Sequence, residues 1–327
     1  MDSALALKAN DQTFCQFDQP VGGGGYAWWY FDAISDDAEY GFTVIAFIGS
    51  VFSPYYAWSD RSRPENHCAI NVALYGKDRT RWAMTERGSA DLHTSSDRFQ
   101  VGPSDIQWSD DKVEIRIREF GAPLPRKLEG TITLHLEATH SEVFDIAGNG
   151  AHYWQPIAPS TRVSVRLSRP DLSWDGTAYF DHNRGSRPLE SDFAYWDWSR
   201  GDLANGDTVI LYNTDMRQGE QKRLSRIFHR DGTNDEIPHP PQAKLSHSPI
   251  FRIPRRTASQ CGLGASVIET LEDAPFYSRS VIETGILGER VLAMNESYVS
   301  ARFRSPITKL MLPFRMPRRP SGRGLAR

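Results

Sequence analysis

Hydrophobic and polar residues alternate with a period of two along much of this chain. Five segments are rich in β-branched or aromatic residues and are bounded by Gly, Pro, Asp or Asn, namely Gly41–Phe52, Lys112–Phe120, Gly130–Ala138, Thr161–Arg169 and Asp207–Asn213. In Lys112–Phe120, valine and isoleucine alternate with charged residues, as in a strand with one buried and one wet face. Long helical patterns are scarce. The patterns therefore predict an all-β protein, mostly antiparallel.

A domain boundary is expected near the middle of the chain. An all-β chain of 327 residues needs closed or packed sheets to cover its strand edges. The stretch Ser168–Gly176 places Pro, Asp and Gly between two strand patterns. We therefore expect two β-barrel or sandwich domains in tandem, residues 1–170 and 171–327. Ligand sites favour domain interfaces and barrel mouths, which directs attention to the residues on either side of this boundary.

Two segments beside the expected boundary contain candidate catalytic residues. Gly150–Pro156 contains His152 and Trp154, and the segment Ala178–Gly185 contains Tyr179 and Asp181. In an extended chain, residues two apart project to the same face, about 6.5–7 Å from each other. Each pair is thus expected to share a face. If the two faces converge, they form a pocket with a carboxyl group, an imidazole and two aromatic rings.

Such a set of side chains suits the hydration of an alkene. A carboxylic acid held against aromatic rings is poorly hydrated, so its pKa rises and it can keep a proton to donate near neutral pH. Aromatic faces stabilise the cation that forms, and a histidine can position water or accept a proton. In the alternative interpretation, Asp181 accepts backbone hydrogen bonds in a turn, His152 is a satisfied interior histidine and the rings are core. The residues by themselves leave both interpretations open.

Two further aromatic pairs are candidates for substrate binding. Trp28 and Tyr30 share a strand face with Asp32, and Trp196 and Trp198 share another. Both pairs either line a pocket or fill a core. The glycine run at 22–25 does not match GxGxxG, and HExxH, GxSxG and Walker sequences are absent from the chain. His152 and His182 have no cluster of acids or histidines at short spacing, so we predict neither a dinucleotide site nor a metal site.

Composition and charge change the picture in two ways. Nine Trp, twelve Tyr and sixteen Phe suit a bulky apolar ligand, and equally a β-rich core.

The net charge of −3 hides an asymmetry, because Arg302–Arg327 contains eight basic and no acidic residues. The acidic remainder argues against nucleic acid. The apolar run Leu310–Phe314 within the basic segment is typical of a surface that meets anionic lipid. A solvated tail, or a tail docked on the acidic body, is the alternative.

The cysteines and the N-terminus bear on the compartment. Cys15, Cys68 and Cys261 are far apart and cannot all pair, which favours a reducing environment. Asp2 stands where a signal peptide would be basic, so we expect no such signal. No stretch approaches the ~18 apolar residues that a membrane span requires.

Longer stretches resemble a known family, the carotenoid 1,2-hydratases (hydroxyneurosporene synthases) of phototrophic bacteria. The matching stretches, among them the rare string YFDHNRG, cover nearly the whole chain in order: Gly24–Tyr56, Gly148–Val163, Gly176–Glu190, Tyr195–Gly201, Leu271–Ser280 and Leu312–Arg319. The resemblance implies two tandem lipocalin-like antiparallel β-barrel domains. It also implies cofactor-free hydration of neurosporene, lycopene or a related acyclic carotenoid at C1–C2, which gives a tertiary alcohol.

The resemblance also assigns a catalytic set. The family's His, Trp, Tyr and Asp fall on His152, Trp154, Tyr179 and Asp181. On physical grounds we expect Asp181 to donate the proton to C2, and Trp154 and Tyr179 to stabilise the C1 cation. His152 is expected to orient water or to tune Asp181.

A carotenoid resides in lipid, so we expect a cytoplasmic enzyme that is peripherally associated with the inner or intracytoplasmic membrane. Fold alone does not settle function. A lipocalin-like carrier of carotenoids or other isoprenoids, and a hydratase or cyclase of another prenylated substrate, are the alternative functions.

Overall fold

Strands dominate the computed structural model, which describes residues 15–77 and 80–319. The predicted class, mostly β and antiparallel, is confirmed. Contacts divide the chain into two compact units. Unit 1 consists of Met1–Asp145, Tyr153–Ser186 and Arg315–Arg327, and unit 2 consists of Ile146–His152 and Arg187–Phe314. All five segments with a period of two overlap strands.

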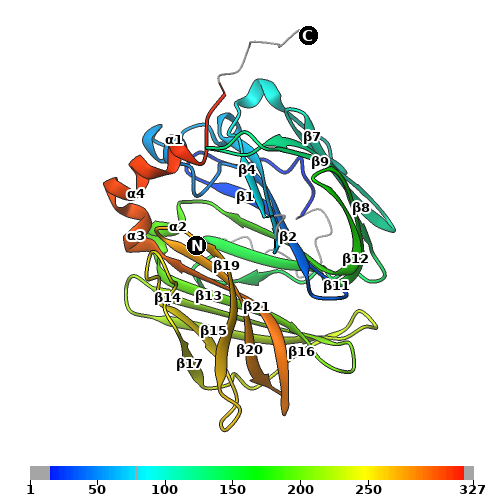
Figure 1. Cartoon of the computed structure of the whole chain (residues 1–327). Coiled ribbons are helices and arrows are strands. Elements are labelled where there is room, and N and C mark those ends of the chain that lie inside the picture. Colours follow the sequence, from blue (N-terminus) through cyan, green and yellow to red (C-terminus); the bar gives the residue numbers. More distant parts are fainter. Residues whose placement is uncertain (1–14, 78–79, 320–327) are drawn as a thin grey trace, which may run out of the picture. The chain divides into compact units, whose positions relative to one another are not determined.

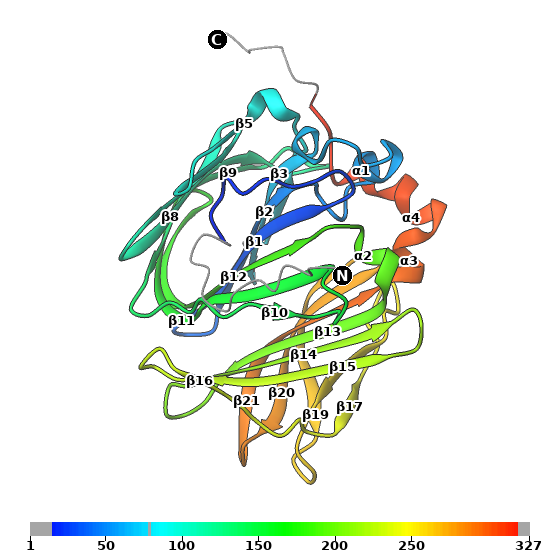
Figure 2. The same ribbon diagram turned by 180° about the vertical axis from the view of Figure 1, so that it is seen from behind.

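Unit 1 is built on one curled antiparallel sheet of twelve strands within the described residues (Figures 1 and 2). In spatial order they are β4 (Arg81–Met84), β3 (Cys68–Gly76), β2 (Tyr40–Ile48), β1 (Tyr26–Ser35), β12 (Asp171–Gly185), β11 (His152–Arg169), β9 (Lys127–His135), β8 (Lys112–Phe120), β7 (Ser104–Ser109), β6 (Arg98–Val101) and β5 (Leu92–Thr94), with β10 (Phe144–Asp145) on β11. Short helices α1 (Pro54–Trp58), η1 (Pro64–Asn66) and η2 (Ser89–Asp91) connect strands.

The core of unit 1 lies on one face of this sheet. In β8 the alternation is as predicted, since Val113, Ile115 and Ile117 are buried in the core. Strand β1 is different, because nearly all of its residues are buried on both faces. Its odd-numbered residues, Trp29 and Phe31 among them, join the apolar core. The even-numbered residues of β1 are therefore buried on the face that points away from this core.

Unit 2 contains a seven-stranded antiparallel sheet and a separate strand pair. The sheet order is β16 (Asn234–Glu236), β15 (Gln221–Phe228), β14 (Thr208–Met216), β13 (Phe193–Asp202), β21 (Glu289–Val299), β20 (Tyr277–Ile286) and β19 (Ala265–Asp273), and the pair is β17 (Gln242–Leu245) with β18 (Arg255–Ala258). Helices α2 (Leu189–Asp192), α3 (Ser300–Arg304), α4 (Pro306–Met311) and η3 (Leu312–Phe314) complete it. No helix in the described part of the chain is long and apolar enough to cross a membrane.

The predicted domain limits, residues 1–170 and 171–327, fall inside the hairpin that β11 forms with β12. From Tyr153 to Ser186 this hairpin belongs to unit 1. Compact units defined by contacts are not the same as independently folding domains. The domain limits therefore stay a prediction.

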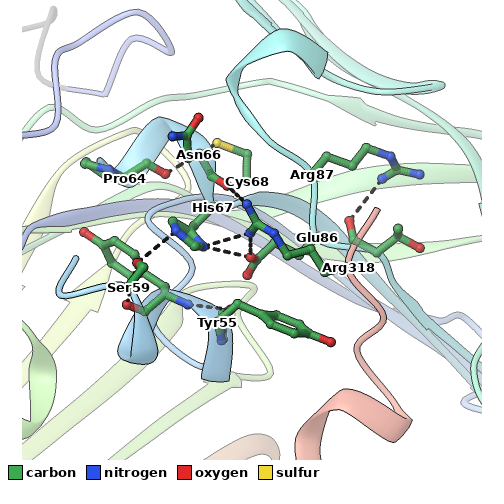
Figure 3. A network of polar contacts seen from close by, with 12 residues as sticks. Tyr55, Ser59, Pro64, Asn66, His67, Cys68, Glu86, Arg87 and Arg318 are labelled. Carbon is green, nitrogen blue, oxygen red and sulfur yellow. Dashed lines mark hydrogen bonds and ion pairs between the residues drawn. The ribbon is translucent and has the colours of Figure 1, made fainter. Parts of the chain in front are cut away.

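The segment Arg315–Arg319 lies on unit 1 and is held by Arg318 (Figure 3). The guanidinium of Arg318 bonds to the carboxylate of Glu86, and its Nη2 donates to the carbonyl of Asn66 at 2.9 Å. Glu86 is buried and also lies 2.8 Å from Nδ1 of His67. This part of the basic segment is docked, which was one of the alternatives left open by the sequence. Arg323 and Arg327 lie outside the described residues.

Candidate functional site

Strands β1 and β12 carry the candidate residues side by side. Their antiparallel register sets Tyr30 opposite Asp181 and Asp32 opposite Tyr179. Directly opposite residues share a face of the sheet. All four side chains are buried. They lie on the face opposite to the apolar core, since their neighbour Phe31 belongs to that core.

Three hydrogen-bond donors converge on the carboxyl group of Asp181, a buried residue that is 4% exposed. Its Oδ2 accepts from the hydroxyl of Tyr179 at 2.7 Å and from the indole N–H of Trp154 at 2.9 Å. Its Oδ1 accepts from Nδ2 of Asn183 at 2.9 Å. Tyr179, Asp181 and Asn183 meet because they are two residues apart on one strand. Three of the four predicted catalytic residues thus lie in contact.

The surroundings act on Asp181 in two opposing ways. Burial disfavours the charged carboxylate, and three donors stabilise it. Tyr179 remains a donor, because burial and the nearby charge of Asp181 raise the pKa of its hydroxyl well above the ordinary value. A protonated Asp181 in this setting would leave behind a well-stabilised carboxylate after giving its proton away. The arrangement is therefore suited to proton donation.

Aromatic side chains surround the carboxyl group within unit 1. Tyr30 contacts Tyr179 edge to face, with ring centroids 6.0 Å apart. Trp154 packs against Phe144, with centroids 5.3 Å apart. Trp28 lies on the same strand face as Tyr30 and stacks on Tyr26 at 4.9 Å. The role of Trp28 and Tyr30 in substrate binding stays a prediction.

His152 belongs to unit 2, where it is fully buried. Its Nε2 lies 2.8 Å from Oδ2 of Asp192, and its ring packs on Phe193. Burial would raise the pKa of Asp192, but hydrogen bonds from Arg187 and His152 outweigh this and lower it. Asp192 is thus a carboxylate that fixes the imidazole. No local sequence pattern links Asp192 to His152, because 39 residues lie between them in the chain.

Trp196 and Trp198 also lie in unit 2, on one face of β13, and both are buried. Trp196 stacks on Tyr298 with ring centroids 5.6 Å apart, and it is 6.1 Å from Tyr212. Trp196 therefore belongs to an aromatic cluster of unit 2. The role of both tryptophans in substrate binding stays a prediction.

His182 lies on the core face of β12, next to Asp181 in the sequence. Its Nδ1 is 3.0 Å from the carbonyl of Trp28, so this nitrogen is the donor, and its ring stacks on Trp29 at 4.8 Å. Burial lowers the pKa of His182 to about 3. It is therefore a neutral structural residue. Among the described residues no group of three or more His, Cys, Asp or Glu side chains could hold a metal ion.

We predict that His182 makes the protein sensitive to acid. Between pH 6.5 and 3 the unfolded chain binds a proton at this residue and the folded chain does not, so stability falls as the pH falls. The slope from this group is at most about 1.4 kcal/mol per pH unit. Urea unfolding from pH 7 to 4 should show a flatter dependence for His182→Phe than for the wild type. An unchanged slope would contradict the assignment, and His135→Phe, at an exposed position, is the control.

Asn183 completes the site and was not singled out from the sequence. Its spacing of two residues from Asp181 was a sufficient signal, since it places both side chains on one face. Its Nδ2 donates to Asp181, as described above, and its Oδ1 has no partner among the described residues.

Comparison with known proteins identifies relatives over most of the chain. The family model for the carotenoid hydratase CrtC matches residues 44–324. An acyclic carotenoid 1,2-hydratase from Thiocapsa roseopersicina is 46% identical over 93% of this chain and 75% of its own length. Another, from Rubrivivax gelatinosus, is 42% identical over 93% of this chain and 76% of its own. A crystal structure of an AttH-type protein from Nitrosomonas europaea, 14% identical, has a TM-score of 0.62 and covers 92% of this chain and 99% of that one, which shows a shared fold.

Proposed function

Because this chain belongs to the carotenoid hydratase CrtC family, we propose that it adds water to the terminal C1–C2 double bond of an acyclic carotenoid, with Asp181 as the acid. Neurosporene, lycopene and their derivatives are the substrates we expect. The observation that supports this most is the buried Asp181 carboxyl with three donors on it and aromatic rings around it. Addition of water to an alkene causes no net oxidation or reduction, so it requires no redox cofactor.

The reaction begins with a proton transfer from Asp181. Its carboxyl proton goes to C2, where the π electron pair forms the new C–H bond. The positive charge develops at C1, the more substituted carbon. The faces of Trp154 and Tyr179 stabilise this cation. The N–H group of Trp154 and the O–H group of Tyr179 stabilise the carboxylate that Asp181 becomes. The same two residues therefore stabilise both charges that the proton transfer creates.

Water then completes the addition. A water oxygen forms a bond to C1, and loss of one proton from that oxygen gives the tertiary alcohol. His152, fixed by Asp192, is assigned the orientation of water or the tuning of Asp181. Trp28, Tyr30, Trp196 and Trp198 are assigned to binding of the polyene. We propose that the two units are lipocalin-like barrels in tandem, a fold that encloses apolar ligands.

Labelled water provides the test. The protein is incubated with lycopene or neurosporene in H2(18)O, and the carotenoids are analysed by mass spectrometry. The expected product carries one labelled hydroxyl group at C1. Recovery of unaltered carotenoid that is demonstrably bound would indicate a carrier. An isomer without the mass of water would indicate a cyclase.

We also propose that the enzyme collects its substrate from a membrane, through α4 and η3 of unit 2. Ile307, Leu310 and Phe314 are 71%, 65% and 76% exposed, whereas Leu312, in the apolar run of the sequence, is buried. Lys309 is the basic residue within this apolar surface. Apolar side chains beside basic ones suit an anionic lipid surface. The inner or intracytoplasmic membrane, approached from the cytoplasm, is the proposed location.

We predict that replacing Ile307, Leu310 and Phe314 by Ser weakens binding to anionic vesicles by more than tenfold. Each apolar side chain inserted into lipid contributes on the order of 1.5–3 kcal/mol. Binding is measured by co-sedimentation with vesicles of phosphatidylglycerol and phosphatidylcholine. The matched control replaces three exposed apolar residues elsewhere in unit 2, Ile250, Ile268 and Leu292. Equal losses in both triple variants would contradict a specific role of α4 and η3.

A further inference from the structure

The tripeptide Tyr-Phe-Asp occurs twice in the chain, at Tyr30–Asp32 and at Tyr179–Asp181. The two copies begin 149 residues apart in the sequence, at Tyr30 and Tyr179, yet β1 and β12 pair them directly. Tyr30 is opposite Asp181, Phe31 is opposite Phe180, and Asp32 is opposite Tyr179. Antiparallel pairing of two identical tripeptides gives the site a local two-fold arrangement.

Each tyrosine in this arrangement donates to the aspartate of its own strand. The hydroxyl of Tyr30 lies 3.0 Å from Oδ2 of Asp32, and that of Tyr179 lies 2.7 Å from Oδ2 of Asp181. On the other face of the sheet, the rings of Phe31 and Phe180 stack with centroids 4.4 Å apart. This stack supports the register that brings the two Tyr–Asp pairs together. The site therefore holds a second buried carboxyl group, Asp32.

The strand register places the two carboxyl groups at diagonal positions of the paired strands. Asp32 and Asp181 are diagonal neighbours on the two strands, for which β-carbons are about 7–8 Å apart at most. In inverting glycoside hydrolases, an acid and a base carboxyl group stand about 6.5–9.5 Å apart, which leaves room for the attacking water. Hydration has the same requirement, since one group must give a proton to C2 and another must take a proton from water at C1.

We propose that Asp32 is the base that accepts the proton of the attacking water, an assignment that rests on the hydratase function proposed above. Asp181 transfers its proton to C2, and the water oxygen forms the bond to C1. The proton of that water passes to the carboxylate of Asp32, and exchange with solvent then returns Asp32 to the carboxylate and Asp181 to the acid. Tyr30 holds Asp32 in position. The two Tyr–Asp pairs thus perform opposite halves of one reaction.

Azide distinguishes a base from a merely structural residue. In Asp32→Ala, hydration should fall about 10²-fold, as for removal of a general base. Azide can occupy the vacated space and add to C1 through nitrogen without losing a proton, so the variant should form a 1-azido carotenoid when azide is present. Asp181→Ala should form none, because azide cannot supply the proton for C2. Products are identified by mass spectrometry.

The outcomes separate this proposal from the hydratase function. Hydration by the wild type is measured first, and its absence would overturn the function itself. With an active wild type, near-normal hydration by Asp32→Ala, or loss of hydration without any azido product, would overturn the role of Asp32. If Asp32→Ala does not fold, Asp32→Ser, whose shorter side chain also leaves space for azide, is assayed in the same way, with the same expected loss and azide product.

Discussion

Replacing Asp181 by Asn should lower kcat for carotenoid hydration at least about 10³-fold, while the variant still folds and binds carotenoid. An amide has no proton acidic enough to transfer to an alkene carbon, and removal of a general acid costs 10²–10⁴-fold in rate. Turnover of lycopene or neurosporene is measured by product formation, and binding by quenching of tryptophan fluorescence. Near-normal turnover would remove Asp181 from the mechanism.

The local hydrogen bonds can adapt to this substitution. The amide oxygen of an asparagine can still accept from Tyr179 and Trp154, while its NH2 group turns toward the side chain of Asn183. Asn183 can rotate its own amide so that Oδ1, which has no partner among the described residues, accepts from that group. The change in stability should therefore be small, about 1 kcal/mol or less.

A matched control separates loss of an acid from loss of any buried charge. Asp105 is another buried carboxyl group of unit 1, paired with Arg116 on the neighbouring strand and with Arg98. Asp105→Asn should leave kcat within about twofold of the wild type, because this group has no contact with the Tyr–Asp pairs. Equal loss of turnover in both variants would point to a general effect on folding.

The period of two along the sequence was sufficient to predict strands and shared faces. It placed Tyr179 with Asp181 and Trp28 with Tyr30, and the structure has both pairs as expected. It could not predict that β1 pairs with β12, because alternation fixes which face a side chain takes and not which strand lies beside it. The meeting of Asp32 with Tyr179 depends on this long-range pairing.

The number of charged residues in the C-terminal segment likewise does not predict which of them form contacts in the fold. Composition shows eight basic residues and no acidic ones from Arg302 onward. It does not show that Arg318 is used inside unit 1 as the partner of Glu86, or that Arg315 packs over the ring of Trp82 at 4.3 Å. The residues that contact these arginines come from distant strands and loops. An arginine that is held by such contacts is not available to bind a lipid surface.

Replacing Tyr179 by Phe should lower kcat about 10²-fold with little change in KM. The hydroxyl of Tyr179 donates to Oδ2 of Asp181, as does the indole N–H of Trp154. Loss of one preorganised donor costs on the order of 10²–10³ in kcat. The ring remains, so binding of the polyene is retained. The hydroxyl acts on the negative charge that develops on Asp181 in the transition state of proton transfer, so its loss lowers kcat.

The control for this prediction is Tyr56→Phe, which removes a hydroxyl that donates to the carbonyl of Gly25 at 2.7 Å. Each substitution deletes a buried tyrosine hydroxyl with two hydrogen-bond partners, Asp181 and Trp154 for Tyr179, and the carbonyls of Gly25 and Arg61 for Tyr56. Each should therefore reduce the free energy of unfolding by a similar amount, about 1–2 kcal/mol. Only Tyr179→Phe should reduce kcat, because only its hydroxyl contacts the acid. A retained kcat in Tyr179→Phe, or equal losses in both variants, would mean that the contact with Asp181 stabilises the fold without supporting proton transfer.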